Sequence, residues 1–392
     1  MSKPRLIVIG PLPPPIHGVA VSTSLVLENK ELRKRFEVEH LDTSDHRAYG
    51  NIGKWEIGNV VLGLRNTVQL IGRLRGRRGI VYLPLSQGSA FMRDSLFIHV
   101  PRLAGWQVVV HLRGSEFPDF YARSSLALRL WIRITLRRVA SAAVMGASLR
   151  GVFSDLVPSE RIAVVPNGTP DPNPDQNGTS TEPDTVLFLS NLRRRKGVVE
   201  AVEAALRVLS ERPSARFLFV GSWESPDLER EVCNRAQEAG PAIRFLPPAT
   251  GETKRALLLS SSVFLFPPVE PEGHPRVVLE AMAAGVPIVT TDRGAIAETV
   301  VDGCAGFVLP DPEPGVLAER VLRLLTKDQL RDRMSQAARA RYVELYTQEA
   351  ADRRLAEWLV ALAERRLDSE KQAAGLGPKP EALERDSARS EA

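Results

Sequence analysis

The stretch over residues 267–292, PPVEPEGHPRVVLEAMAAGVPIVTTD, constrains the fold of this chain more than any other. Residues 262–266 (SVFLF) are typical of a buried strand, and two prolines end that strand. Pro275 suits the first position of a helix, where its missing N–H costs nothing, and Gly285 suits the residue just after the helix end. A second strand over residues 286–290 follows. A strand, loop, helix and strand in this order predict an α/β fold.

The same unit predicts a binding site. It directs a helix N-terminus, with its free N–H groups, at the crevice beyond the strand ends, where a phosphate is stabilised. Glu272 lies in the loop and Glu280 on the helix, so both carboxylates could hold hydroxyl groups near that phosphate. Phosphate and hydroxyl groups together indicate a nucleotide-sugar site. The alternative is that Glu280 lies on a solvated helix face and that Glu272 only makes the loop acidic.

Length and composition fit two globular domains. A chain of 392 residues, 43% apolar and 25% charged, is long enough for two domains with a core each. The net charge of +5 permits anionic partners without selecting one. Two cysteines are too few for a disulfide framework or a zinc site, and no apolar run approaches ~18 residues. A cytoplasmic protein is therefore expected.

Two series of alternating strands and helices are predicted. The first covers residues 1–167, opening with a strand and a long helix over residues 19–35, and the second covers residues 185–345. Between them, residues 168–184 are rich in Pro, Asn, Asp and Gly and form the predicted linker. The predicted architecture is two facing Rossmann-like, doubly wound domains with a cleft between them.

The C-terminal residues are predicted to lie outside the second series of strands and helices. A closing helix is expected over residues 346–368. Residues 369–392 contain almost no large apolar side chains, so they are expected to be disordered.

Several motifs together resemble those of the bacterial retaining nucleotide-sugar glycosyltransferases of family 4 (glycosyl transferases group 1), which have the GT-B fold. The longest, EGHPRVVLEAMAAGVPIVTTD, is similar to the E-x7-E block of that family. GPLPPPIHGVAVST near the N-terminus is similar to its glycine loop, and VVVHLRGSEFPDFY resembles the block around its acceptor-side histidine. VVPNG, FLSNLRRRKG and FLFVG occur in the order that the family shows. The resemblance covers most of residues 5–345.

The resemblance implies roles for the donor-side residues. Glu280 would hold the ribose hydroxyls of the donor nucleotide, and Glu272 would approach the donor sugar. Lys196 would neutralise the diphosphate, and Gly18 would let the first loop approach it; a helix start and a plain turn glycine are the alternatives. The sugar and diphosphate would face backbone N–H groups around His274, Pro275, Arg276 and Val277.

The chain departs from the family pattern on the donor side. Asn191 stands where the family most often has Arg, and three arginines follow it. Arg193, Arg194 or Arg195 would then assist Lys196. His274 stands where an aromatic residue is common, and the first loop offers one glycine rather than two.

A further departure concerns the acceptor side. Arg113 stands where the family often has the His of an HG pair, and His111 lies two residues earlier. With Glu272, these two residues are the catalytic candidates. The alternatives are a core histidine at a strand end for His111 and a structural salt bridge for Arg113.

The expected function is that of a retaining glycosyltransferase, moving a hexose or N-acetylhexosamine from a UDP- or GDP-linked sugar to a glycan or lipid-linked glycan in bacterial surface polysaccharide synthesis. No acidic pair of the DxD type suits a divalent metal, so neither a metal nor another cofactor is expected. Fixed cations and backbone N–H groups can stabilise the leaving diphosphate instead. The alternatives are a catalytically degenerate partner or binding subunit and a nucleotide-sugar epimerase on the same fold.

Expected partners, besides the nucleotide sugar, follow from a basic amphipathic helix. Arg129, Arg133 and Arg137 recur every fourth residue within LALRLWIRITLRRVA. Two interpretations stay open: a core helix with a solvated basic face, or peripheral contact with anionic lipid around a polyprenyl-linked acceptor at the inner face of the cytoplasmic membrane. Aromatic residues are not interleaved with these arginines, which argues against nucleic acid.

Overall fold

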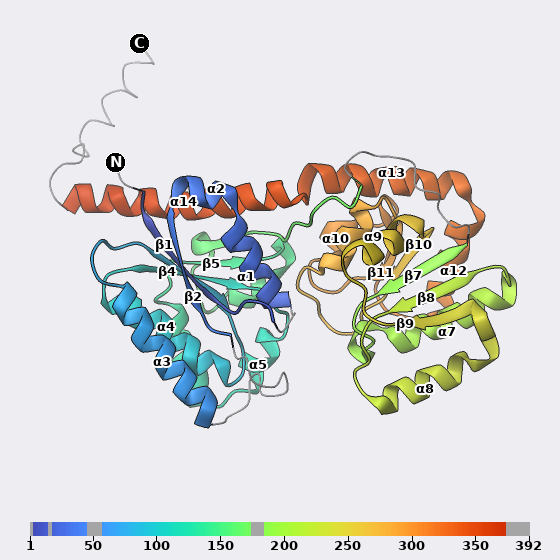
Figure 1. Cartoon of the computed structure of the whole chain (residues 1–392), viewed down its shortest axis with the longest axis horizontal. Coiled ribbons are helices and arrows are strands. Elements are labelled where there is room, and N and C mark those ends of the chain that lie inside the picture. Colours follow the sequence, from blue (N-terminus) through green and yellow to red (C-terminus); the bar gives the residue numbers. More distant parts are fainter. Residues whose placement is uncertain (1–2, 15–17, 45–56, 174–183, 374–392) are drawn as a thin grey trace, which may run out of the picture.

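The protein consists of two α/β halves placed side by side (Figure 1). The computed structural model describes residues 3–14, 18–44, 57–173 and 184–373. Most of the predicted linker and of the predicted tail therefore lies outside the described residues. Each half is built around a six-stranded parallel sheet, so the predicted doubly wound α/β fold is confirmed.

The first sheet has the strand order β2-β1-β3-β4-β5-β6. Two of its inner strands are buried along their whole length, as expected for a parallel sheet covered on both faces. The strands are β1 (Arg5–Gly10), β2 (Glu37–Asp42), β3 (Ile80–Leu85), β4 (Gln107–Leu112), β5 (Ser141–Val144) and β6 (Ile162–Val164).

Alternate side chains of these strands build two separate cores. Leu6 and Val8 of β1 pack under one layer of helices, whereas Ile7 and Ile9 pack under the other. The first layer contains α1 (Gly18–Glu28), α2 (Lys30–Arg35) and α14 (Gln348–Ala373). The second contains α3 (Ile57–Arg73), α4 (Ala90–Leu103) and α6 (Leu126–Leu136), with α5 (Phe117–Arg123) beside it.

The second sheet has the strand order β12-β11-β10-β7-β8-β9. Its strands are β7 (Thr185–Leu189), β8 (Arg216–Val220), β9 (Ile243–Leu246), β10 (Val263–Phe266), β11 (Ile288–Thr291) and β12 (Gly306–Leu309). Its helices are α7 (Val198–Glu211), α8 (Pro226–Ala236), α9 (Gly251–Ser260), α10 (Arg276–Ala283), α11 (Ile296–Val300), α12 (Pro314–Thr326) and α13 (Asp328–Leu345). The 3-10 helices of the chain are η2 (Ala147–Phe153), η3 (Ser159–Arg161), η4 (Arg194–Lys196) and η5 (Gln237–Ala242).

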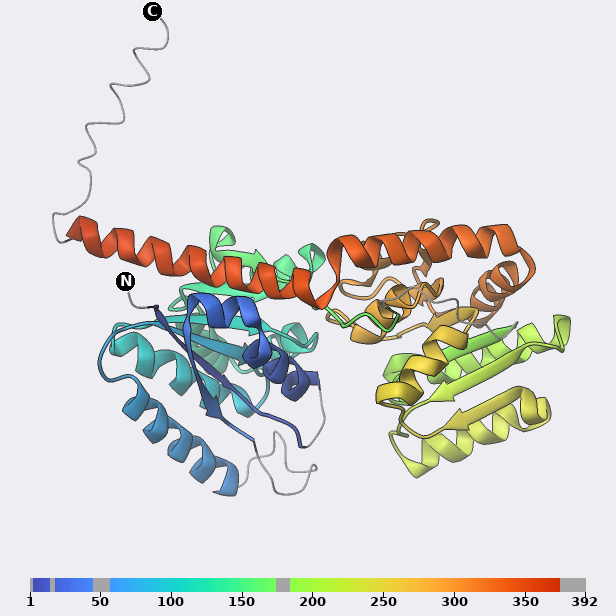
Figure 2. The same ribbon diagram turned by 45° about the horizontal axis from the view of Figure 1, so that its top comes forward.

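Helix α14 returns from the second half to the first (Figure 2). Its Leu355, Leu359 and Leu362 are buried against Leu6 and Val8 of β1. The helix continues to Ala373, so residues 369–373 of the predicted disordered tail are helical.

Two predicted helix boundaries were wrong. The helix expected over residues 19–35 is two helices, because the Asn29 side chain accepts a hydrogen bond from the Leu32 N–H (2.9 Å) and starts α2. Pro275 is the N-cap of α10 rather than its first helical residue. At the other end of α10, Gly285 has a φ of 70° after the C-cap Ala284, as predicted.

The packing of α14 generates a stability prediction. Leu359 is fully buried, so Leu359→Ala should lower the free energy of unfolding of the first half by about 2–5 kcal/mol. Leu126→Ala is the control, since Leu126 is 82% exposed, and it should change that energy by less than about 0.5 kcal/mol. Guanidinium titrations measure both, and equal effects would show that α14 does not belong to the core of the first half.

Candidate functional site

The candidate site lies where the strand order of the second sheet reverses, between β7 and β10. Ligands of doubly wound sheets bind beyond the carboxyl ends of the strands at such a point. Lys196 follows β7, and Glu272 follows β10. The Lys196 ammonium donates to Glu272 Oε1 over 2.5 Å, and Glu272 is only 6% exposed. The fold therefore brings together two residues that are 76 positions apart.

Two glycines allow these loops to come so close. Gly197 has a φ of 78°, and a Cβ there would lie 1.9 Å from the Pro267 carbonyl oxygen. Gly294 has a φ of 64°, and its Cβ would lie 1.6 Å from the Glu272 carbonyl oxygen. Because no other residue fits either position, the glycines hold the Lys196 and Glu272 loops in place.

Glu280 lies on α10 and has an unexpected partner. The Lys254 ammonium of α9 donates to Glu280 Oε1 over 2.7 Å. Glu280 Oε2 is buried and has no hydrogen-bond partner among the described residues. Lys254 was not predicted as a site residue, because nothing in the ETKRALLLS segment indicates that α9 lies against α10.

The three arginines before Lys196 have different surroundings. Arg195 forms an ion pair with Glu116 of the first half and lies 3.6 Å from Glu270. Arg194 pairs with Glu231 on α8, away from the Lys196–Glu272 pair. Arg193 is the partly buried N-cap of η4, and Asn191 is exposed. Arg195 is thus the arginine that the fold places beside the Glu270–Glu272 loop.

The His274 side chain lies in the joint between the two halves. Its Nδ1 accepts a hydrogen bond from the Asn167 N–H (3.0 Å), and its carbonyl oxygen accepts one from Asn167 Nδ2 (2.8 Å). Burial, reinforced by the charges of Arg276 and Arg354, lowers its pKa to about 3. The imidazole is therefore neutral and holds the start of the interdomain segment.

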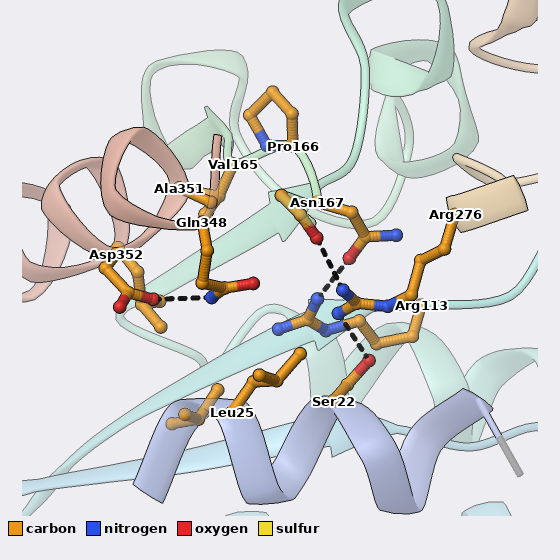
Figure 3. A pocket seen from close by; sticks show the side chains of 13 residues that line it. Ser22, Leu25, Arg113, Val165, Pro166, Asn167, Arg276, Gln348, Ala351 and Asp352 are labelled. Atoms are coloured by element: carbon orange, nitrogen blue, oxygen red, sulfur yellow. Dashed lines mark hydrogen bonds between the residues drawn. The ribbon is translucent and has the colours of Figure 1, made fainter. Parts of the chain in front are cut away.

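Arg276 and Arg113 meet at a small cavity in the same joint (Figure 3). The cavity has a volume of about 30 Å³, with Asp352 of α14 also in its wall. Arg276 donates to the Gly168 carbonyl oxygen (2.5 Å) and lies 3.4 Å from Ser22 Oγ of α1. Burial, then the charge of Arg113, lowers the pKa of Arg276 to about 10, so it is still protonated near neutral pH.

The two acceptor-side candidates have structural partners. Arg113 donates to Asn167 Oδ1 (2.7 Å) and to the Tyr82 hydroxyl (2.8 Å), which are neutral groups, and it forms no salt bridge with any of the described residues. His111 has no exposed surface, and its ring packs edge-on against Tyr82 and Trp358 of α14. The burial of the His111 imidazole favours the predicted alternative of a core histidine at a strand end.

The remaining predicted residues are Gly18 and Val277. Gly18 is the first residue of α1, and a Cβ on it would face open space, so the fold itself does not require glycine there. Residues 15–17 of the same loop lie outside the described residues. Val277 lies in the first turn of α10 and packs against the core of the second half.

Two features are absent from the described residues. In this part of the chain, no group of three or more His, Cys, Asp or Glu side chains could hold a metal ion. No helix in it is both long and apolar enough to cross a membrane.

The buried His274 predicts a pH dependence of stability. The unfolded histidine has a pKa near 6.5 and the folded one near 3, so only the unfolded chain takes up this proton between those values. Stability should therefore fall by about 1.4 kcal/mol per pH unit as the pH drops below about 6. His274→Asn keeps an acceptor for the Asn167 N–H and should remove this part of the slope in denaturant titrations. An unchanged slope would contradict a neutral His274.

Comparisons with known proteins find a family that matches most of the second half. Residues 171–341 match the family described as Glycosyl transferases group 1. A phosphatidyl-myo-inositol mannosyltransferase of Mycolicibacterium smegmatis is 27% identical over 253 residues, which cover 61% of this chain and 64% of that protein. The match thus spans less than two thirds of that relative.

Solved structures match the fold over nearly the whole chain. A glycosyltransferase of Rickettsia africae has a TM-score of 0.72 at 16% identity, covering 93% of this chain and 99% of the other. Anabaena HepE, solved in complex with UDP and glucose, has a TM-score of 0.68 at 16% identity, covering 91% and 100%. The predicted GT-B fold is confirmed, and residues 171–341 are similar to the glycosyl transferases group 1 family, as predicted.

Proposed function

We propose that the protein is a retaining glycosyltransferase that uses a UDP- or GDP-linked hexose or N-acetylhexosamine and needs no metal. The observation that carries the proposal is the Lys196–Glu272 pair at the carboxyl ends of β7 and β10, beside the N-terminus of α10. A cation, a carboxylate and a helix N-terminus at one point suit a sugar diphosphate.

Lys196 and α10 supply the chemistry at the leaving group in this proposal. When the bond between the sugar and the diphosphate breaks, negative charge develops on the diphosphate. The Lys196 ammonium and the first N–H groups of α10 stabilise that charge from fixed positions. When the donor binds, Glu272 gives up its contact with Lys196. Its carboxylate then lies beside the sugar, where positive charge develops.

Glu280 is the proposed ribose ligand. Its Oε1 is held by Lys254, and its Oε2 is buried without a partner among the described residues. A buried carboxylate oxygen of this kind is a strong acceptor for a hydroxyl donor. Lys254 then acts as the positioning residue that fixes the carboxylate.

The acceptor hydroxyl loses its proton to the departing diphosphate in this mechanism. His111 is fully buried, and the Arg113 guanidinium donates to Asn167 and Tyr82 and has no acceptor atom. Neither candidate can therefore serve as the base. A diphosphate oxygen lies on the same face as the attacking hydroxyl when the configuration is retained, so proton transfer between them is direct.

The named relatives support the substrate classes. The Mycolicibacterium protein is named for mannosyl transfer to phosphatidyl-myo-inositol, a lipid, and the Anabaena structure contains UDP and glucose. By analogy, we propose a glycan or polyprenyl-linked glycan as acceptor, used in surface polysaccharide synthesis at the inner face of the cytoplasmic membrane.

Donor binding tests the ribose contact. Glu280→Gln should weaken binding of UDP or GDP, whichever the wild type prefers, by about 10- to 150-fold, because a hydrogen bond to a charged group contributes about 1.5–3 kcal/mol. Isothermal titration calorimetry without metal measures the affinity. Glu344→Gln, at an exposed position on α13, is the control and should bind like the wild type. Equal affinity of both variants would exclude Glu280 from the site.

Turnover tests the Lys196–Glu272 pair. Lys196→Met and Glu272→Gln should each lower kcat for donor hydrolysis or transfer by roughly 10²–10³-fold, since each removes charge from the transition state. Glu270→Gln, in the same loop but exposed, should keep most of the activity. Wild-type donor binding without turnover on any acceptor tried would favour a binding subunit.

A further inference from the structure

The small cavity at the joint has more positive than negative charge in its walls. These walls come from α1 and the residue after β4 in the first half, from the start of α10 in the second half, and from α14 (Figure 3). The charged residues among them are Arg113, Arg276 and Asp352, so two guanidiniums and one carboxylate leave a formal charge of +1. Neither Lys196 nor Glu272 lines this cavity, which is therefore not the candidate donor site.

The two guanidiniums belong to different halves of the protein. Arg113 follows β4 of the first half, and Arg276 is the first residue of α10 in the second half. Both side chains extend toward the segment at Asn167, as Figure 3 shows. Burial, then the charge of Arg113, lowers the pKa of Arg276 to about 10, so the two like charges are close enough to repel each other.

Neither guanidinium is neutralised by a carboxylate of the described residues. The hydrogen-bond partners of Arg113 and Arg276 there are all uncharged groups, namely those of Asn167, Tyr82, Gly168 and Ser22. Asp352, the carboxylate in the wall, accepts a hydrogen bond from Gln348 Nε2 (2.8 Å) instead. A buried charge without a counter-charge costs free energy, so these two arginines favour an anion between them.

One donor of this pair also lacks an acceptor. The Nε of Arg113 is buried and has no hydrogen-bond partner among the described residues. Because a guanidinium can only donate, its partner has to be an acceptor. Gln348 Oε1, in the same wall, is a buried acceptor that also has no partner in this part of the chain, so a water molecule is the alternative occupant. A water molecule would leave the charge of +1 uncompensated.

A third guanidinium adds to the positive charge of the joint. Arg354 of α14 donates to the Leu345 carbonyl oxygen and forms no salt bridge with a described residue. After burial, the charges of Arg276 and Arg354 are what lowers the pKa of His274 to about 3. The positive charge therefore extends beyond the walls of the cavity itself.

We propose that the joint cavity binds one monovalent anion of chloride size between Arg113 and Arg276. The volume of about 30 Å³ exceeds the roughly 10–15 Å³ that one water molecule needs. A tetrahedral oxyanion has four oxygen atoms, each about the size of a water molecule, and needs more room. The anion turns a repulsion between the two halves into attraction to a shared charge. The inference goes beyond the proposed transfer reaction and does not depend on it.

Thermal unfolding tests the site. Sodium chloride replaces sodium gluconate at constant ionic strength, because gluconate is too large for the cavity. Chloride at about ten times its Kd should raise the Tm of the wild type by roughly 2–5 °C. Arg113→Gln removes one of the two guanidiniums and should abolish the rise. Arg333→Gln removes the same charge at an exposed position on α13, and this control should keep the rise.

A second variant changes the charge without touching either arginine. Arg113→Gln also alters the hydrogen bonds to Asn167 and Tyr82, so its own stability can change. Asp352→Asn instead removes the carboxylate from the cavity wall, and with it a repulsion on the anion. The rise in Tm should then occur at lower chloride concentrations than in the wild type. A rise that needs the same or more chloride would contradict an anion in this cavity.

Bromide locates the anion directly. A crystal of the wild type grown with sodium bromide, at the concentration that saturates the rise in Tm, should show an anomalous peak between Arg113 and Arg276. Three results would overturn the proposal. The first is equal Tm in chloride and gluconate, and the second is the full rise in Arg113→Gln. The third is a cavity that holds only water, or that holds bromide only far above that concentration.

Discussion

The ion pair between Lys196 and Glu272 is the interaction on which the candidate site depends. It joins the loop after β7 to the loop after β10, and both groups are largely removed from water. A charge pair in such a place contributes little net stability, but the loss of one partner leaves an uncompensated charge. Gly197 and Gly294 allow the two loops to approach this closely. The Lys196–Glu272 pair costs desolvation energy and requires two glycines with positive φ. A role in ligand binding explains such a pair more readily than a contribution to stability does.

The joint between the two halves contains a buried contact between His274 and Asn167 and, separately, several exposed hydrogen bonds. The buried contact lies where the interdomain segment passes α10. Elsewhere between the two halves, the Ser115 hydroxyl donates to the Pro271 carbonyl oxygen (2.6 Å), and the Ser148 hydroxyl donates to the Glu298 carboxylate (2.9 Å). Polar contacts of this kind are typical of domains that move relative to each other.

The sequence predicted those parts of the site that depend on a local pattern of residues better than those that depend on contacts between distant segments. The strand, helix and strand around Glu280 follow from proline, glycine and apolar spacing, and they were confirmed. The burial of His111 was not predictable, because the Trp358 that covers it lies on a helix from the far end of the chain. Lys254 was missed for the same reason, since only the packing of α9 brings it to Glu280. A local sequence pattern does not indicate which distant segments of the chain come into contact.

A crystal structure with the preferred nucleoside diphosphate tests the central claim most directly. The account predicts that the Lys196 ammonium leaves Glu272 and contacts the diphosphate, which lies at the N-terminus of α10. The ribose hydroxyls should then contact Glu280, with Lys254 still holding the other oxygen of that carboxylate. A nucleotide bound elsewhere, or bound with the Lys196–Glu272 pair intact, would contradict the account.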